Sequence, residues 1–157
     1  MSQFLPLLLF LHVMGAILAF GPTFAYSIMG AMAGREPQHA NFSLRQVEAI
    51  GNKLVYPLAI FQGVTGVLLI IASGRNLTAE KWLGIAIVLY AIALAYALTV
   101  QRNALHSLIK LTSTPPAPGS APSPEIPATV KKIQRGGTFL GLTIVVIVFL
   151  MVVKPTF

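Results

Sequence analysis

The sequence predicts an all-α protein, a four-helix transmembrane bundle, and three observations support this prediction. Of its 157 residues, 55% are hydrophobic and only 10% are charged, whereas soluble domains carry about a quarter charged residues. Long apolar runs alternate with short polar segments. The net charge of +7 comes from basic residues that flank these runs and do not interrupt them. The composition excludes a soluble domain, and we expect no nucleic-acid partner.

The four expected spans are apolar runs of one membrane domain that covers residues 1–157: 4–33, 54–72, 82–100 and 137–153. A helix of about 20 apolar residues crosses the hydrocarbon core of a bilayer, and each run is close to that length or longer. The first run is longer than the apolar part of a signal peptide, and no Lys or Arg precedes it. We therefore expect it to be a true span.

Basic residues are distributed unevenly between the two sides of the bundle. Eight Lys and Arg residues lie in the connections after the first and third runs, whereas three, Arg75, Lys81 and Lys154, lie on the other side. Cytoplasmic connections carry the excess of Lys and Arg in membrane proteins. This predicts both termini outside and the two larger connections in the cytoplasm.

The helices are expected to extend beyond the bilayer on the cytoplasmic side. Ser43 and Gln46 have the spacing of a capping box, so the second helix should begin near Ser43 and bend at Pro57. The third helix has no breaker before residue 112. Residues 112–129 then hold six of the eleven prolines, which predicts a flexible linker.

Charged side chains are absent from all four runs, and His12 is the one imidazole inside a run. Ion-coupled transport usually needs a buried carboxylate or cation that changes charge, so a proton-coupled transporter is disfavoured. Gly15, Ala16 and Ala19 follow His12 at helical spacing. The imidazole is therefore expected to lie over a groove of small side chains.

This groove has two interpretations. In the first, a neighbouring helix packs against the small residues and His12 makes an interhelical hydrogen bond. In the second, the groove holds haem, and the neutral imidazole is an axial ligand of its iron. The other histidines, His39 and His106, belong to the cytoplasmic connections. We expect both to be solvated, so a second histidine ligand from the same chain is not expected.

Polar side chains on the other runs are candidates to assist His12. Thr65 and Tyr90 match its depth in the bilayer, and Gln62 lies one helical turn from Thr65. These three are candidates for hydrogen bonds beside the haem or to a quinone carbonyl. Arg75, among the basic residues on the outer side, is a candidate to neutralise the haem propionates.

Two weaker patterns concern copper and self-association. Copper would need soft donors beside His12, and their spacing in the sequence builds no site. These donors are Met14, Met29 and Met151. Glycines four residues apart are typical of helix contacts in membranes, so a homo-oligomer and packing within the chain are equal alternatives. The pairs are Gly30 with Gly34 and Gly137 with Gly141.

Several short motifs together resemble a family of bacterial integral membrane proteins called domain of unknown function 2269. They are Leu11-His12 with Gly15, Pro57 with Thr65-Gly66, Trp82 opening the third run, and Met151 to Pro155 closing the fourth. The resemblance covers nearly the whole chain and implies a four-helix fold in the bacterial inner membrane. The chain is also distantly similar to copper-resistance-type permeases and to the haem-associated protoporphyrinogen oxidase of bacteria. A first-helix histidine ligates haem in that oxidase, which implies the same role for His12.

The leading hypothesis is a membrane-embedded b-type haem protein with His12 as an axial ligand. It is expected to perform redox chemistry with quinol as its lipid-soluble partner and oxygen as the electron acceptor. Two alternatives stay open. In one, the chain is a cofactor-free membrane subunit or assembly factor, and His12, Thr65 and Tyr90 only fix the helix register. In the other, it is a copper-uptake permease.

Overall fold

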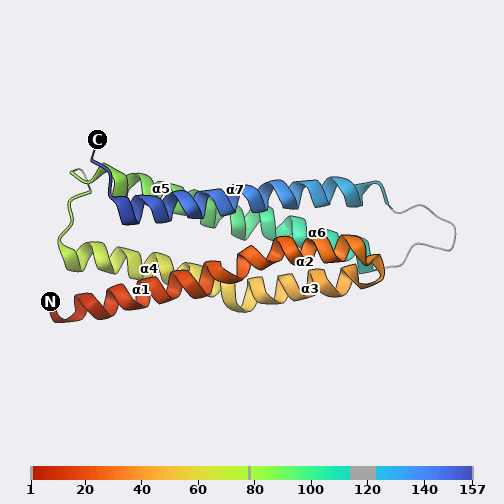
Figure 1. The fold of residues 1–157 in the computed structure, drawn as a ribbon, viewed down its shortest axis with the longest axis horizontal. Helices are drawn as coiled ribbons and strands as arrows, with labels where there is room; N and C mark the ends of the chain where they lie inside the picture. Colours follow the sequence, from red (N-terminus) through yellow and green to blue (C-terminus); the bar gives the residue numbers. More distant parts are fainter. Residues whose placement is uncertain (1, 78, 114–122, 157) are drawn as a thin grey trace.

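The computed structural model describes residues 2–77, 79–113 and 123–156. They form an elongated, all-helical bundle in which the first helix begins and the last helix ends at the same end (Figure 1). We call the half with these ends the terminal half; it contains α1, α4, α5 and the C-terminal part of α7. The distal half contains α2, α3, α6 and the N-terminal part of α7.

The helical elements follow one another with few interruptions. In chain order they are η1 (Ser2–Phe4), α1 (Leu5–Phe20), η2 (Gly21–Ala25), α2 (Tyr26–Arg35), η3 (Pro37–His39), α3 (Ala40–Ile50), η4 (Gly51–Val55), α4 (Tyr56–Ser73), α5 (Lys81–Tyr96), η5 (Ala97–Gln101), α6 (Arg102–Ser113) and α7 (Glu125–Val153).

Within the described residues, four helical stretches are long and apolar enough to cross a membrane: Leu5–Arg35, Pro37–Ser73, Lys81–Ser113 and Glu125–Val153. This confirms the predicted all-α architecture with four membrane-spanning helices. The last three stretches are much longer than their apolar runs. Their extra turns all lie in the distal half, at the end away from the termini.

Two prolines lie where the long helices change geometry. Pro22 lies in the 3₁₀ turn η2 between α1 and α2, and Pro57 follows the π-helical turn η4 between α3 and α4. Proline lacks an N–H and crowds the carbonyl four residues earlier, so the neighbouring turn tightens or widens. The bend expected at Pro57 thus coincides with a π-helical turn. A second such turn, η5, joins α5 to α6.

The second long helix begins several turns before its apolar run, as predicted, but the predicted capping role of Ser43 is wrong. A 3₁₀ turn begins at Pro37 and α3 begins at Ala40, so Ser43 lies inside the helix and does not cap it. The Ser43 hydroxyl donates a hydrogen bond to the carbonyl oxygen of Met29 on α2, 3.3 Å away. Pro37 explains the earlier start, because proline is favoured in the first turn, where its missing N–H would have no partner.

The linker is shorter than the predicted 112–129. Helix α6 extends through Ser113 and α7 begins at Glu125, while residues 114–122 lie outside the described residues. Pro127 is the third residue of α7. The first turn of a helix has no intrahelical partners for its N–H groups, so proline is tolerated there.

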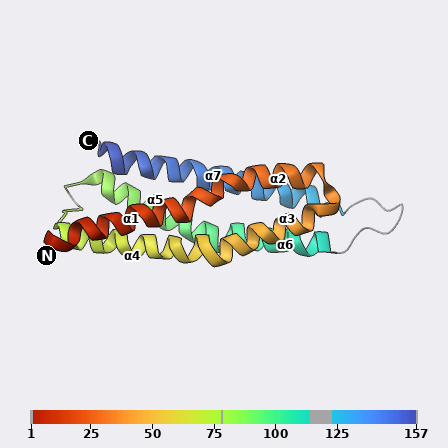
Figure 2. The same cartoon turned by 60° about the horizontal axis from the view of Figure 1, so that its bottom comes forward.

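The helices pair differently in the two halves. In the terminal half, α1 packs along α4 and α5 packs along α7, and only a short contact joins α4 to α5. In the distal half, α2 packs on α3, α3 on α6 and α6 on α7. Figure 2 shows α1 beside α4 and α3 beside α6.

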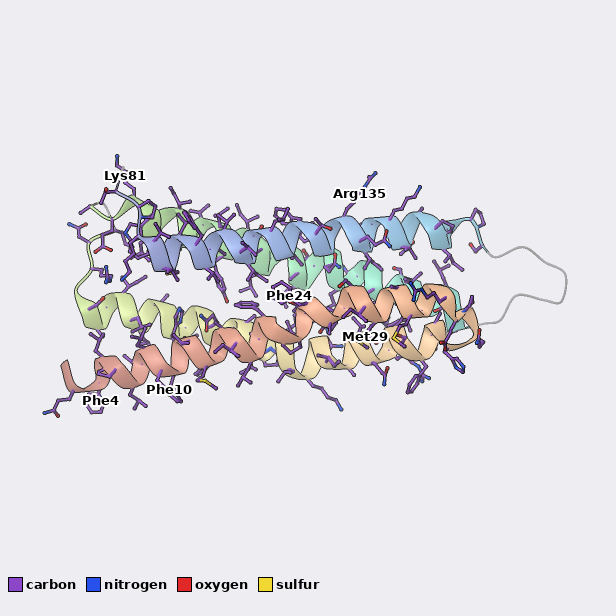
Figure 3. All side chains as sticks on the ribbon, in the orientation of Figure 1. Phe4, Phe10, Phe24, Met29, Lys81 and Arg135 are labelled. Carbon is purple, nitrogen blue, oxygen red and sulfur yellow. The ribbon has the colours of Figure 1, made fainter. Side chains whose placement is uncertain are left out.

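A buried apolar cluster joins α5 to α7 in the terminal half. It consists of Trp82, Leu83, Ala86 and Leu150, and we call it the Trp82 cluster. Many other large apolar side chains are exposed, and Figure 3 shows Phe4 and Phe10 pointing away from the bundle. A lipid bilayer would cover this apolar outer surface.

Candidate functional site

His12 lies between α1 and α4 with a polar partner at each ring nitrogen. Its Nδ1 is 3.0 Å from the Thr65 Oγ1, and its Nε2 is 3.0 Å from the Gln62 side-chain nitrogen. Both partners come from α4 and are buried, with exposed fractions of 7% for Gln62 and 2% for Thr65. We call these three residues the His12 cluster.

The placement of the Gln62 and Thr65 side chains favours one tautomer of His12. An amide nitrogen only donates, so the Gln62 side chain donates to the ring Nε2, which accepts. The neutral imidazole then carries its proton on Nδ1 and donates it to the Thr65 hydroxyl oxygen. The hydroxyl hydrogen of Thr65 is left for the carbonyl oxygens of Phe61 and Gln62, each 3.1 Å away. The lone pair of the imidazole is therefore on Nε2.

One buried atom of the His12 cluster, the Gln62 Oε1, has no hydrogen-bond partner within the described residues. An unpaired buried amide oxygen costs about 1–3 kcal/mol. A bound group that donates a hydrogen bond would remove this cost. The His12 cluster therefore contains two acceptor atoms, the Nε2 of His12 and the Oε1 of Gln62. Nε2 accepts a hydrogen bond from the Gln62 amide nitrogen, whereas Oε1 has no partner within the described residues.

Small residues let α1 and α4 approach closely around the His12 cluster. Gly15 and Ala19 are buried and Ala16 is half-buried. A Cβ added to Gly15 would lie 2.8 Å from the Gln62 Oε1, and one added to Gly66 would lie 3.2 Å from the His12 Cε1. The groove of small residues is therefore filled by α4. The Gln62 amide, 3.0 Å from Nε2, would have to move away before a metal could bind that nitrogen.

Tyr90 lies near the His12 cluster but contacts other residues of α4. Its hydroxyl donates to the carbonyl oxygen of Ala59 on α4. Its ring lies against Gly63, where an added Cβ would be 3.2 Å from the Tyr90 Cε1. Within the described residues no hydrogen bond joins Tyr90 to His12. Tyr90 instead links the α5–α7 pair to the α1–α4 pair.

Arg75 lies in the turn after α4 and already has partners. Its guanidinium is 2.6 Å from a carboxylate oxygen of Glu80 and lies 5.8 Å from the centroid of the Trp82 ring. An ion pair this exposed contributes little stability. Arg75 would have to leave Glu80 to neutralise a propionate.

The soft donors considered for copper do not gather at His12. Met151 packs against the Trp82 cluster, and Met29 lies in the distal half. The two glycine pairs, Gly30 with Gly34 and Gly137 with Gly141, have no atom within 4 Å of an added Cβ. Among the described residues, no other helix therefore packs against these glycines.

Sequence reasoning missed the polar contacts of the distal half. His106, expected to be solvated, is half-exposed and pairs with Glu48, with 3.0 Å between its Nδ1 and the carboxylate oxygen. His39 lines a hollow of about 190 Å³ whose wall also includes Met29, Met32 and Glu36. Only the packing of α3 on α6 reveals the first contact. The hollow has a partial signal in the sequence, because Met29, Met32 and Glu36 share one face of a helix.

Two further hydrogen bonds join the helices of the distal half to one another. The Gln101 side chain donates to the carbonyl oxygen of Ile133 on α7, 3.1 Å away. The Asn41 side chain on α3 donates to the carbonyl oxygen of Ile109 on α6, 3.0 Å away. The first bond starts from the last residue of the π-helical turn η5, and the second starts from the first turn of α3.

A comparison with protein families gives one match. The family described as "Predicted integral membrane protein (DUF2269)" matches residues 6–155. This range contains the His12 cluster and nearly all of the four candidate spans. No curated protein and no solved structure matches the chain.

Proposed function

Since the chain belongs to the DUF2269 family of integral membrane proteins, we propose that it is a multi-pass membrane protein that binds b-type haem and carries out redox chemistry with quinol. His12 is the proposed axial ligand, through its Nε2. Oxygen is the proposed electron acceptor. The position of His12 early in the first helix, beside two buried polar side chains of α4, supports this role.

The observation that supports the proposal best is that each ring nitrogen of His12 has a polar partner on α4. Iron takes the lone pair of a neutral imidazole, and the opposite ring N–H of a ligating histidine usually donates to an acceptor that orients the ring. Thr65 is such an acceptor at 3.0 Å from Nδ1. The residues present therefore fit an axial ligand, provided that Gln62 leaves Nε2.

The other residues of the site have defined roles in this proposal. Haem supplies a carrier for single electrons when it is bound. Gln62, once displaced from Nε2, offers an amide donor and acceptor to a hydroxyl or carbonyl of quinol. Gly66 leaves room for the imidazole face, and Tyr90 holds α5 against α4 beside the site. Gly15, Ala16 and Ala19 keep α1 close enough for the His12 bonds.

The proposed location is the bacterial inner membrane, with the distal half in the cytoplasm. Eight Lys and Arg residues lie on the helical elements of the distal half or at its edge, against three at the other end. The cysteine-free chain permits a direct test with single cysteines. A membrane-impermeant maleimide should label Ala79→Cys in intact cells and should leave Ser123→Cys unlabelled. The reverse labelling pattern would overturn this orientation.

The test of haem binding is an oxidised and dithionite-reduced absorption spectrum of the detergent-purified protein. The wild type should show a Soret and an α band, normalised to protein mass. His12→Ala should lose both bands, and His106→Gln should keep them, because its ring lies at Glu48 in the distal half. A colourless wild type from haem-supplemented cells would refute the haem proposal.

A second variant keeps the test valid when His12→Ala does not fold. Gln62→Leu retains His12 and its Thr65 partner but frees Nε2, so haem occupancy should stay equal or rise. In the wild type, anaerobic addition of a soluble quinol should reduce the haem, which the α band reports. A haem that quinol leaves oxidised would restrict the proposal to haem binding alone.

The alternative function is a cofactor-free membrane subunit or assembly factor. Its specific support is that both ring nitrogens of His12 already have partners within the chain. In that case the His12 cluster fixes the register of α1 against α4, and Gln62→Leu only destabilises the fold. The outward-facing glycine pairs then favour a second copy or a partner subunit, which the detergent-purified complex would retain on size-exclusion chromatography.

A further inference from the structure

The distal half contains a hollow that is separate from the His12 cluster. It lies between α2 and α3 and has a volume of about 190 Å³. Four of the residues in its wall carry atoms that ligate metals: Met29, Met32, Glu36 and His39. Figure 3 shows Met29 where α2 faces α3. The chain has only five methionines and three histidines, so this gathering is unusual for its composition.

Local structure explains why these residues share the hollow. Met29, Met32 and Glu36 are three and four residues apart, which puts them on one face of α2 and the residue that follows it. The turn η3 then brings His39 to the start of α3. The hydrogen bond from the Ser43 hydroxyl to the Met29 carbonyl, 3.3 Å long, holds α3 beside α2 at the same level.

The histidine of the hollow differs from the other two. His12 has partners at both ring nitrogens, and His106 is paired with Glu48. In the part of the chain that the structure describes, no hydrogen bond or ion pair engages the ring of His39 or the carboxylate of Glu36. The imidazole of His39 is therefore free to bind a ligand without the loss of an existing contact.

The donor set selects the kind of metal. Among the described residues, no three His, Cys, Asp or Glu side chains come together, so the hollow does not offer the ligands that Zn²⁺ prefers. The chain has no cysteine. Two thioethers and one imidazole are soft and borderline donors, and this combination suits Cu(I). We propose that the hollow between α2 and α3 binds one Cu(I) ion through Met29, Met32 and His39.

The test measures Cu(I) binding by the full chain in detergent, without oxygen and with a reductant. Bicinchoninate forms a coloured Cu(I) complex, and the wild type should withdraw one equivalent of Cu(I) from it. The double variant Met29→Leu/Met32→Leu should weaken binding about tenfold or more. The matched control, Met14→Leu/Met151→Leu, removes two methionines outside the hollow and should bind as the wild type does.

Three outcomes would overturn the proposal. They are a wild type that withdraws no Cu(I), a Met29/Met32 double variant that binds as tightly as the wild type, and a control that loses as much affinity as that variant. X-ray absorption of the copper-loaded protein should show sulfur scatterers, and a shell of nitrogen and oxygen alone would also refute it. His12→Ala should keep its Cu(I) affinity, so this result is independent of the haem test.

Discussion

The two helix pairs of the terminal half are held together by different chemistry. Between α5 and α7 the contact is the apolar Trp82 cluster, and Leu83 is only 3% exposed. Between α1 and α4 the buried contact includes an imidazole, an amide and a hydroxyl. Among the described residues, no side-chain hydrogen bond joins α5 to α7, so apolar packing holds this pair together.

This difference allows a test of whether the α1–α4 contact does more than hold the fold. Polar side chains within a membrane are costly and are commonly retained for function. The Trp82 cluster gives a local reference for the stability that packing alone provides. Substitutions in the two pairs should therefore separate stability from function.

The largest expected effect is in the apolar pair. Leu83→Ala removes a side chain from the Trp82 cluster and should lower the free energy of unfolding by about 2–5 kcal/mol, because a cavity is left behind. Unfolding in mixtures of SDS and mild detergent measures this change. Leu142→Ala on α7 is the control, since that leucine is 62% exposed and faces lipid. Equal losses for the two variants would show that the Trp82 cluster is not the core of this pair.

The next-largest effect tests the close approach of α7 to the end of α5 and to η5. Gly136→Ala on α7 should cost about 1–3 kcal/mol, because the new Cβ would overlap the Gln101 Oε1 and lie 2.8 Å from the Tyr96 hydroxyl. The neighbouring Gly137 has no atom within 4 Å of an added Cβ. Gly137→Ala should therefore leave the thermal unfolding temperature unchanged or raise it slightly, because alanine is the better helix former. A loss of stability in both variants would contradict the packing described at Gly136.

A smaller effect is expected from substitution of Gly66, a glycine at the contact between α1 and α4. Gly66→Ala would bring a Cβ to 3.2 Å from the His12 Cε1, and a shift of the ring should limit the cost to about 1 kcal/mol. The same shift should alter haem occupancy, which the Soret band reports. Gly84→Ala, where an added Cβ meets nothing within 4 Å, is the control for both measurements. An unchanged Soret band with intact stability would mean that the imidazole does not depend on Gly66.

The smallest effect on stability belongs to Thr65→Val. Loss of the Thr65 oxygen leaves the Nδ1–H of His12 unpaired, and interhelical hydrogen bonds in membranes contribute about 0.6 kcal/mol on average. Thr99→Val is the matched control, because among the described residues the Thr99 hydroxyl bonds the Ala95 carbonyl of its own helix, 2.6 Å away, and no neighbouring helix. Haem binding should weaken in Thr65→Val and not in Thr99→Val. The same haem affinity in both variants would remove Thr65 from the proposed site.

Periodicity and residue depth predicted part of the candidate site. Thr65 was singled out because it matches the depth of His12 along its own span, and Gln62 because it is polar within an apolar run. Tyr90 also matches the depth of His12, yet its hydroxyl bonds the Ala59 carbonyl. Depth along a span is a property of the sequence, but the direction in which a side chain points around the helix depends on which helix lies beside it.

The hollow at Met29 shows a different limit. Its residues lie on both sides of η3, and the sequence alone shows that Met29, Met32 and Glu36 share a face but not that His39 returns to that face. The same reason explains the contact of His106 with Glu48, which joins residues 58 positions apart. Such contacts depend on how α3 packs against α2 and α6.

The sequence by itself determined that the chain is an all-α membrane protein with four spanning helices, because apolar length and the absence of charge within each run depend only on residue order. Tertiary structure alone decided which helices pair, which side chains lie beside the ring of His12, and which methionines line the same hollow as a histidine. These features depend on the rotation and closeness of helices far apart in the chain. Small residues such as Gly15 and Gly66 permit that closeness, and their neighbours become known only once the helices are packed.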